Sequence, residues 1–331
     1  MSWGTVCLIM RLGVFLLAGR FPGQDDRDAL GRASDAVVWA ERAGFDDVWI
    51  AEHHFMSYGV CPSAITFTAH ALGRTERITV GTAVSVLSTT HPVMLAEQVT
   101  MLDQMSGGRL HLGVGRGGPW RDLEVFGTGV DRWENGFAES LDLLLECLSE
   151  PTVAGTGRFD FRAVPMVPRP ERRPRVTVAC TSPGTIGIAA DRDLPMLLGM
   201  DLDEAGKAAM IEAYERAGGR ADNHIGAVLA HVADSREQAE AELRAAMPTW
   251  LEPGLKGYVA VDDRPRKPHD PVEYTEHLIR ISPIGTAEQC LDRLREGASG
   301  IGHYILMVDG CGDPQVTRRT IERIGYLMGV V

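Results

Sequence analysis

Two adjacent histidines follow a short apolar run in the segment Ala51-Glu52-His53-His54-Phe55. A histidine can act as a general acid or base because its unperturbed pKa of about 6.5 lies near working pH. Neighbouring side chains on an extended chain point to opposite sides, so only one of the two can face a given site. The segment therefore predicts one histidine available for chemistry beside one that packs.

Two structural alternatives compete with a catalytic histidine here. A packed histidine bonded to Glu52 or Glu97 is the commoner fate of an isolated histidine, but a position at the carboxyl end of a strand favours function for one of the pair. A divalent-metal site could be drawn from Glu52, His53, His54 and Asp122. We disfavour it because the side chains of neighbouring strand residues diverge.

A second set of residues indicates a phosphate-bearing ligand. Arg116 is a fixed positive charge on a glycine-rich turn, where a ligand can approach the backbone closely. Thr181, Ser182, Gly184 and Thr185 offer hydroxyls and backbone N–H groups just before an expected helix, which is a favourable place for a phosphate. Each signal is weak alone, and together they predict a phosphate-bearing ligand.

The elements that must position these residues alternate along the chain. Short, near-continuous apolar runs are typical of parallel strands covered on both faces. They are Arg11–Leu17, Asp47–Ala51, Ile78–Leu87, Arg109–Val114, Arg175–Cys180, Leu194–Leu198, Ala227–Val232 and His303–Val308. Helical patterns lie between them, among them Ala29–Ala43, Ser63–Arg74, Pro92–Met105 and Trp133–Leu148. About eight such repeats predict an α/β fold, a (β/α)8 TIM barrel, whose active site lies at the carboxyl ends of the strands.

Two segments interrupt this alternation. Residues 150–174 are rich in Pro, Arg and Gly and are expected to form a small hairpin or a wrapped loop. Residues 250–282 are polar and proline-rich, and we expect a lid or substrate loop there rather than a buried element. With these two insertions, residues 1–331 are expected to form a single domain.

Composition narrows the class of partner. The chain has 331 residues and a formal net charge of −12, from 33 Lys and Arg against 45 Asp and Glu, so nucleic acid and anionic membrane surfaces are unexpected partners. Its cysteines are single and unpaired in spacing, which indicates free thiols in a reducing cytoplasm. They are Cys7, Cys61, Cys147, Cys180, Cys290 and Cys311. Residues 1–9 are expected to be an extension before the first strand.

Four stretches together resemble the bacterial luciferase-like flavin monooxygenases, closest to the luciferase α chain within that family. They are GFDDVWIAEHHF, ITVGTAVSVLSTTHPVMLAEQVTMLDQMSGGRLHLGVGRG, RDLEVFG and ISPIGTAEQCLDRL. The likeness runs from Arg11 to the last helix and is poorest over residues 250–280. The combination of AEHHF with HPVMLAEQVTMLDQMSGGR is specific.

The resemblance implies a barrel that binds reduced, non-covalent FMN at its C-terminal mouth. There the flavin reacts with O2 to give a C4a-hydroperoxide, which oxygenates an organic substrate. A separate NAD(P)H:flavin reductase would supply the reduced flavin, and the protein would be a homodimer. The Ala-, Arg- and Gly-rich composition is associated with GC-rich genomes, in which such enzymes serve natural-product tailoring.

The resemblance also implies roles for individual residues. His53 matches the family's catalytic histidine, so we expect His53 to face the flavin and His54 to pack away from it. Ala83 and Val84 match a non-proline cis peptide beneath the flavin ring. Arg116 and the turn from Thr181 to Thr185 match phosphate-contacting positions. Asp122 matches an acidic residue near the active site.

Departures from the luciferase pattern affect the expected substrate. Gly115 stands where luciferase has a reactive cysteine, and Cys180 stands where it has an acidic residue beside the phosphate. A glycine at 115 is expected to widen the pocket for a bulkier substrate than a straight-chain aldehyde, so light emission is not implied. Two rival functions remain. One is a deazaflavin-dependent oxidoreductase on the same barrel, and the other is a non-catalytic flavin-binding partner subunit, which the presence of His53 disfavours.

Overall fold

The apolar runs form a closed parallel barrel in the computed structural model, which describes residues 10–266, 270–297 and 301–329. Within these ranges eight parallel strands pair in the order β3, β2, β1, β13, β10, β9, β8 and β5, and β3 also pairs with β5, which closes the ring. The strands are β1 (Arg11–Leu16), β2 (Asp47–Ile50), β3 (Thr79–Thr82), β5 (Leu110–Gly115), β8 (Arg175–Cys180), β9 (Met196–Leu198), β10 (His224–Leu229) and β13 (Ile301–Met307). The predicted (β/α)8 barrel is confirmed.

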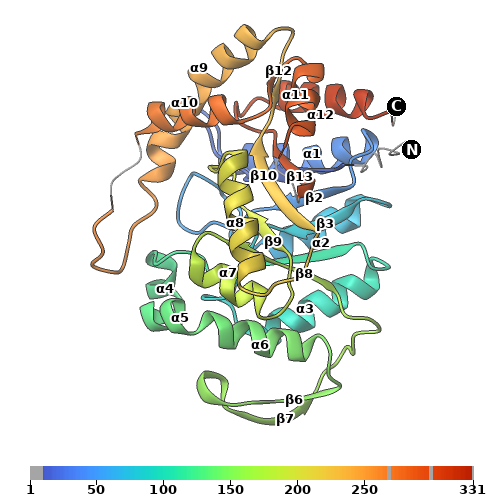
Figure 1. Ribbon diagram of the computed structural model, residues 1–331, viewed down its shortest axis with the longest axis vertical. Coiled ribbons are helices and arrows are strands. Elements are labelled where there is room, and N and C mark those ends of the chain that lie inside the picture. The colour runs from blue at the N-terminus through green and yellow to red at the C-terminus, as the bar shows by residue number, and fades with distance from the viewer. Residues whose placement is uncertain (1–9, 267–269, 298–300, 330–331) are drawn as a thin grey trace.

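Helices surround this barrel and connect its strands (Figure 1). They are α1 (Asp26–Arg42), α2 (Ala64–Arg74), α3 (Pro92–Met105), α4 (Arg121–Val125), α5 (Gly129–Asn135), α6 (Phe137–Cys147), α7 (Pro183–Ala190), α8 (Glu204–Arg216), α9 (Arg236–Leu255), α10 (Pro271–Ile281), α11 (Ala287–Arg295) and α12 (Pro314–Leu327). Short strands complete the structure: β4 (Ser85–Val86), β6 (Thr152–Gly155), β7 (Phe161–Pro165), β11 (His231–Val232) and β12 (Ile284–Gly285), together with a 3-10 turn at Gly157–Phe159.

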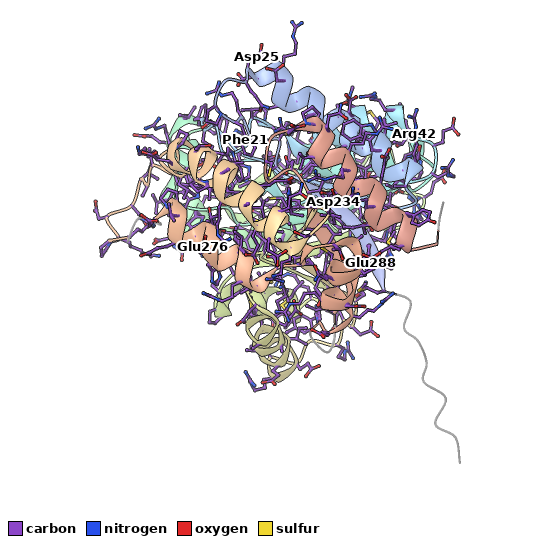
Figure 2. The ribbon with its side chains drawn as sticks, turned by 90° about the horizontal axis from the view of Figure 1, so that it is seen from above. Phe21, Asp25, Arg42, Asp234, Glu276 and Glu288 are labelled. Atoms are coloured by element: carbon purple, nitrogen blue, oxygen red, sulfur yellow. The ribbon has the colours of Figure 1, made fainter. Side chains whose placement is uncertain are left out.

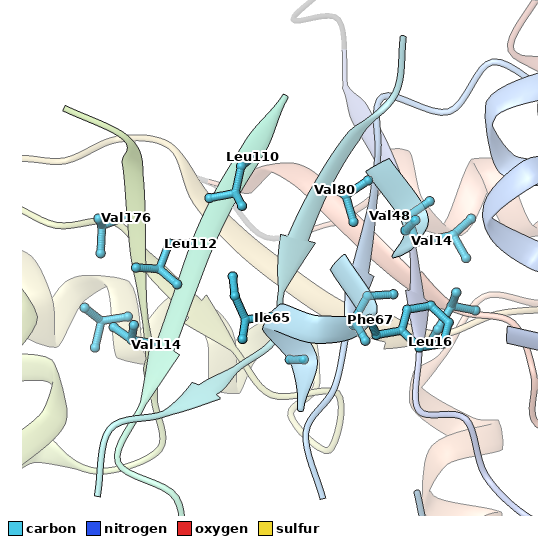
Figure 3. Packing of buried hydrophobic residues seen from close by; sticks show 14 of the residues in the cluster. Val14, Leu16, Val48, Ile65, Phe67, Val80, Leu110, Leu112, Val114 and Val176 are labelled. Atoms are coloured by element: carbon cyan, nitrogen blue, oxygen red, sulfur yellow. The ribbon is translucent and has the colours of Figure 1, made fainter. Parts of the chain in front are cut away.

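Each strand contributes to two cores because successive side chains point to opposite faces. In β1, Val14 and Leu16 belong to the outer core between strands and helices, whereas Phe15 belongs to the core inside the barrel. Figure 3 shows the outer core, in which Val14 and Leu16 lie near Val48 and Val80 of the neighbouring strands. Burial on both faces is why the strands are continuously apolar.

Local capping sets where the helices begin. Asp25 accepts a hydrogen bond from the backbone N–H of Asp28 at 2.8 Å and forms a capping box with it, so α1 starts three residues before the predicted Ala29. Ser63 caps α2 through a 3.3 Å bond from the N–H of Thr66. The predicted bounds of α3 are those observed.

The strand predicted over Ile78–Leu87 is interrupted. It consists of β3 and β4, and the peptide bond between Ala83 and Val84, which separates them, is cis. The helix predicted over Trp133–Leu148 is likewise divided at Gly136 into α5 and α6. The strand predicted over Ala227–Val232 begins earlier, at His224, and its last residues form β11 instead.

The two interrupting segments differ in outcome. Residues 150–174 contain the antiparallel pair of β6 and β7, so the predicted hairpin is confirmed. The prediction of a loop over residues 250–282 is wrong at both of its ends. The last residues of α9 occupy 250–255 and bury Trp250, and α10 occupies 271–281, capped by Asp270. Pro271 at the first position of α10 and the Asp270 cap are start signals that the proline-rich composition obscured.

Helices α9 and α10 lie side by side over one face of the molecule, where Figure 2 labels Glu276 on α10. An ion pair between Arg244 and Glu276, with 2.6 Å between Nε and Oε1, joins them. Helix α9 reaches the barrel through Trp250, which is 1% exposed. Between the two helices, residues 267–269 lie outside the described ranges.

A polar cluster fills the N-terminal end of the barrel. The Oδ1 atom of Asp47 accepts hydrogen bonds from Trp49 Nε1 at 2.8 Å and from His303 Nε2 at 2.9 Å, and Oδ2 pairs with Arg11 at 2.9 Å. Burial alone would raise the pKa of the Asp47 carboxyl, but these partners hold it below its usual value. Gly13 is required here, because a Cβ atom would lie 2.0 Å from Asp47 Oδ1.

Cys61, Cys147, Cys180, Cys290 and Cys311 are free thiols. Cys7 and the expected extension over residues 1–9 lie outside the described ranges. Among the described helices, none is both long enough and apolar enough to span a bilayer.

Candidate functional site

His53 stands at the C-terminal mouth of the barrel, three residues beyond the end of β2. Its backbone N–H donates to the carbonyl of Cys61 at 2.9 Å, which fixes the position of the residue. Its Nδ1 atom is buried, and within the described ranges no hydrogen-bond partner meets it. Burial, with a smaller contribution from His54, lowers the pKa of His53 to about 4. The ring is therefore neutral near pH 7 and can accept a proton.

Aromatic side chains enclose His53. Tyr58 meets it edge-on, with ring centroids 5.0 Å apart, and Tyr258 lies 6.3 Å away in a similar orientation. Trp250 stacks on Tyr58 at 4.9 Å and on Phe21 at 5.1 Å. The sequence analysis missed these aromatic residues. They come from helix α9 and from three loops far apart in the chain, and no spacing relates them.

His54 and Glu52 have mainly structural contacts. Glu52 accepts the backbone N–H of Ala64 at 2.9 Å and that of Val86 at 3.1 Å, so it caps α2 and anchors β4. His54 Nε2 lies 3.8 Å from Glu52 Oε1, and its ring meets Phe126 edge-on at 5.0 Å. Of the two predicted carboxylate partners for a packed histidine, Glu52 is the one that these contacts show.

Asp122 lies in the first turn of α4 and is 7% exposed. Its Oδ1 atom is buried without a hydrogen-bond partner in the described part of the chain. Burial raises the pKa of this carboxyl, and the nearby His54 opposes that effect. The structure thus brings Asp122 to the mouth beside His54. Across residues 10–266, 270–297 and 301–329, no group of three or more His, Cys, Asp or Glu side chains is arranged to hold a metal.

The cis peptide at Ala83 and Val84 lies against the ends of two other strands. Pairing of Val86 with Gly115, and of Val114 with Val178, brings β4, β5 and β8 together. A Cβ atom on Gly115 would lie 2.6 Å from Val84 Cγ2. The Val84 side chain therefore occupies the space that the small residue leaves, and the expectation that Gly115 widens the pocket is not met at this point.

Arg116 follows β5 directly, with its backbone carbonyl held by Ser88 Oγ at 2.6 Å. Its guanidinium lies over the ring of Trp133 at 4.4 Å, and Arg264, which pairs with Glu134, lies over the same ring at 5.5 Å. Arg116 Nε is buried and lacks a hydrogen-bond partner among the described residues. Burial and the charge of Arg264 lower the pKa of Arg116. These features suit an anionic ligand.

The turn before α7 uses some of the donors expected for a phosphate. Thr185 Oγ1 accepts the backbone N–H groups of Ser182 at 3.1 Å and of Thr181 at 3.2 Å, and Ser182 Oγ accepts that of Thr185 at 3.3 Å. Ser182 and Thr185 thus form a capping box. Thr181 and Gly184 are exposed, so the Thr181 hydroxyl and the Gly184 N–H are what this turn presents to a ligand.

Cys180 is not a reactive group. Its Sγ lies 3.4 Å from the carbonyl of Thr185, and burial raises the pKa of the thiol to about 12. Since Val114 is level with Val178, Arg116 is level with Cys180, and the two ligand-facing turns lie at the same edge of the barrel.

A cavity of about 550 Å3 opens beside His53. It lies between the residues after β1, the loop after β2, and the residues at the end of α9, with Arg121 of α4 on its wall. His53 is the one predicted site residue in this lining; Arg116 and Thr181 lie elsewhere on the mouth. The structure therefore brings the predicted residues to one end of the barrel but not into one cavity.

Comparison with known families matches residues 10–303 to the family described as luciferase-like monooxygenase. The chain is 30% identical over 335 residues to the 4-hydroxyprotoasukamycin monooxygenase of Streptomyces nodosus subsp. asukaensis, covering 94% of this chain and 89% of that protein. It is 27% identical over 319 residues to the alkanal monooxygenase alpha chain of the Kryptophanaron alfredi symbiont, covering 88% and 89%.

Solved structures share the fold at lower identity. Monooxygenase RslO1 from Streptomyces bottropensis has a TM-score of 0.83 at 21% identity, covering 96% of this chain and 98% of that one. The oxygenating constituent of 3,6-diketocamphane monooxygenase from Pseudomonas putida, in complex with FMN, has a TM-score of 0.77 at 18% identity. That match covers 96% of this chain and 97% of that one. An F420-dependent secondary alcohol dehydrogenase has a TM-score of 0.68 at 18% identity, and the match covers 95% of this chain and 99% of that one.

Proposed function

Since the chain belongs to the family of luciferase-like monooxygenases, we propose that it oxygenates a small organic substrate with O2 and reduced FMN. The observation that carries the choice of a phosphate-bearing flavin is Arg116, whose buried Nε lacks a partner among the residues described. A phosphate would supply the missing acceptor and neutralise a guanidinium that Arg264 repels. When bound, reduced FMN supplies two electrons and a ring carbon to which oxygen can bond.

Different residues at the mouth would bind different parts of this cofactor. Arg116, the Thr181 hydroxyl and the Gly184 N–H would bind the phosphate, while Ser182 and Thr185 fix the turn that presents them. Ala83 and Val84 would lie beneath the flavin ring. Val84 is held in place there because it packs into the space at Gly115.

His53 would act on protons during oxygen transfer. A neutral imidazole that lines the cavity can accept a proton from the substrate or hold one, a role typically worth ~10²–10⁴ in rate. Tyr58 and Tyr258 exclude water from one side of the ring. Exclusion of water matters because a site open to water loses its oxidising equivalents as hydrogen peroxide. Asp122, with its raised carboxyl pKa, would be a second acidic group of the site, acting beside His54.

A deazaflavin such as F420 is the second candidate cofactor, because a dehydrogenase of the same fold binds it. Oxygenation is favoured by the monooxygenase with 30% identity, and FMN by the FMN complex of a structure with a TM-score of 0.77. A non-catalytic flavin-binding subunit is the third candidate, and the availability of His53 argues against it.

Two protein partners follow from the proposal. A separate NAD(P)H:flavin reductase in the cytoplasm would supply the reduced cofactor. A second copy of the chain would pack on α3, where Met94, Met101 and Met105 are 49%, 45% and 78% exposed. Their spacing places them on one face of the helix, as expected for a homodimer interface.

The experiment is a comparison of the two flavins in both redox states. Under anaerobic conditions we expect the chain to bind reduced FMN more tightly than oxidised FMN, and on admission of O2 to consume it and release hydrogen peroxide when no substrate is present. Equal weak binding of both redox states without oxygen consumption would contradict the proposal. Anaerobic alcohol oxidation with F420 would support the second candidate.

A further inference from the structure

The cavity beside His53, called the His53 groove below, approaches that residue from a different side than the proposed flavin site. Its walls are Arg20 and Asp26 after β1, residues 53–62 after β2, Arg121 on α4, and residues 253–259 at the end of α9. Arg116 and Thr181 follow β5 and β8, which lie across β3 from β2 in the barrel. A ligand in the His53 groove and a flavin on Arg116 would therefore lie over different strands of the same barrel mouth.

The loop after β2 and the residues at the end of α9, which form the groove, are in close contact. Gly257 lies so close to Met56 that a Cβ atom at 257 would be 2.3 Å from Met56 Cβ. Gly59 lies against His53, where a Cβ would be 2.6 Å from Nδ1. The floor at His53 is thus closed by backbone rather than by mobile side chains, and the open end of the groove is its charged rim.

The rim carries more positive than negative charge. Arg20, Arg121 and Lys256 line the groove, against the single carboxylate of Asp26. Asp26 is already paired with Arg20 at 2.8 Å. Lys256 is 3.1 Å from Glu252, but both side chains are exposed, at 73% and 64%, and such surface pairs are weak.

Arg121 has no ion pair or hydrogen-bonded acceptor in the described part of the chain and is exposed at the rim. A surplus of cations around a concave site is notable in a chain of net charge −12. A cleft lined by one sign of charge concentrates ligands of the opposite sign. The remaining wall is largely apolar, with Phe55, Val60 and Val259 among its residues.

We propose that the His53 groove binds the substrate as an organic anion, with a carboxylate at Arg121 and Lys256 and an apolar body extending toward His53. This inference rests on the proposed function for its link to oxygenation, but the binding itself does not. The charged end would stay at the solvated rim, and the apolar end would reach the enclosed part of the mouth. Arg121 is then the specificity-determining residue.

The test compares octanoate with octan-1-ol, which share an apolar chain and differ in charge. Binding is measured by calorimetry on the full chain at low ionic strength. We expect octanoate to bind at least ~10-fold more tightly than octan-1-ol, because only the carboxylate can form a charge-assisted contact with Arg121. Raising the salt concentration should reduce the preference because the rim is exposed.

Variants locate the preference in the groove. Arg121→Ala should reduce it to ~3-fold or less, and Arg121→Glu should instead favour octylammonium over octanoate. Arg162→Ala is the matched control, because Arg162 is an exposed arginine on β7, on the hairpin at the opposite end of the molecule from α9 (Figure 1). Melting curves confirm that each variant is folded.

The outcomes separate the two proposals. If the chain binds reduced FMN and consumes O2 but binds octanoate and octan-1-ol equally, or if Arg121→Ala keeps the full preference, the groove is not an anion site and the proposed function stands. If the preference is present and disappears in Arg121→Ala while the chain neither binds flavin nor consumes O2, the anion site stands and the proposed function is wrong.

Discussion

The two ends of the barrel treat buried polar groups in opposite ways. At the N-terminal end, Asp47 is fully buried, and its two oxygens are shared among Trp49, His303 and Arg11. At the C-terminal end, His53 and Asp122 each bury a polar atom for which the described residues provide no partner, and so does Arg116. Both ends are built from the same strands.

This difference distinguishes an end whose polar groups are paired within the protein from an end that leaves polar groups available to a ligand. Buried polar groups are normally hydrogen-bonded, and leaving one unpaired costs about 1–3 kcal/mol. The N-terminal end meets that requirement around Asp47, so its polar residues contribute to stability. At the mouth, Arg116 Nε and Asp122 Oδ1 lack such partners among the described residues, as expected where a bound molecule completes the hydrogen bonds. His111 is an exception at the N-terminal end, because its Nε2 bonds Thr177 at 2.7 Å while its Nδ1 has no partner in the described ranges.

The largest expected effect is at the N-terminal end. Asp47→Ala should lower the free energy of unfolding by about 3–5 kcal/mol, because it leaves His303, Trp49 and Arg11 without their shared acceptor. Urea denaturation measures this. Asp292→Ala, at an exposed pair with Arg295, is the control and should cost less than about 1 kcal/mol. An Asp47 variant as stable as the control would remove the distinction between the two ends.

At His53 we expect a large loss of activity with little loss of stability. His53→Ala should slow substrate oxygenation by ~10²-fold or more and divert oxygen to hydrogen peroxide, while stability and flavin affinity change little. His54→Ala should mainly cost stability, by about 1–3 kcal/mol, through its lost contacts with Glu52 and Phe126. Product and peroxide yields, together with melting curves, measure both. Similar behaviour of the two variants would show that the catalytic histidine is misassigned.

The third change tests whether Arg116 binds the phosphate of FMN. Arg116→Ala should weaken FMN binding by ~10–100-fold and leave riboflavin binding nearly unchanged, because riboflavin lacks the group that the guanidinium would contact. Fluorescence titration of both flavins measures the ratio, with Arg162→Ala as the control. Equal losses for FMN and riboflavin would place Arg116 outside the phosphate site.

The most gradual effect, spread over a range of pH, concerns the ionisation of His53. Because burial depresses the pKa of His53 to about 4, below the value of about 6.5 for an unfolded chain, the unfolded state binds a proton in this window and the folded state does not. Stability should therefore fall as pH drops from about 6.5 to 4. In His53→Ala this slope should be shallower by at most about 1.4 kcal/mol per pH unit. Urea unfolding across the range would show identical slopes if His53 were not buried in its neutral form.

Much of the fold could be predicted because its signals are local. Continuous apolar runs such as that of β1, proline at the start of α3 and serine before α2 each depend on residues a few positions apart. The motif around His53 likewise placed a histidine at the end of a strand. The expectation failed over residues 250–282, where composition suggested a loop but α9 and α10 are held by contacts with distant residues.

The site shows the same limit. The sequence could name Arg116 and Thr185, but not that Thr185 would use its hydroxyl to cap its own turn, nor that Val84 would fill the space at Gly115. Those facts depend on how segments from different strands approach one another, which no local pattern encodes.

The sequence by itself determined the alternation of strands and helices, the caps, and the residue types at the carboxyl ends of the strands, because these follow from neighbours along the chain. Only the tertiary structure decided that Tyr58 and Tyr258 lie against His53 and that Arg121 and Lys256 share one groove with it. Closure of the barrel brings these residues together, and burial then sets which polar atoms have partners.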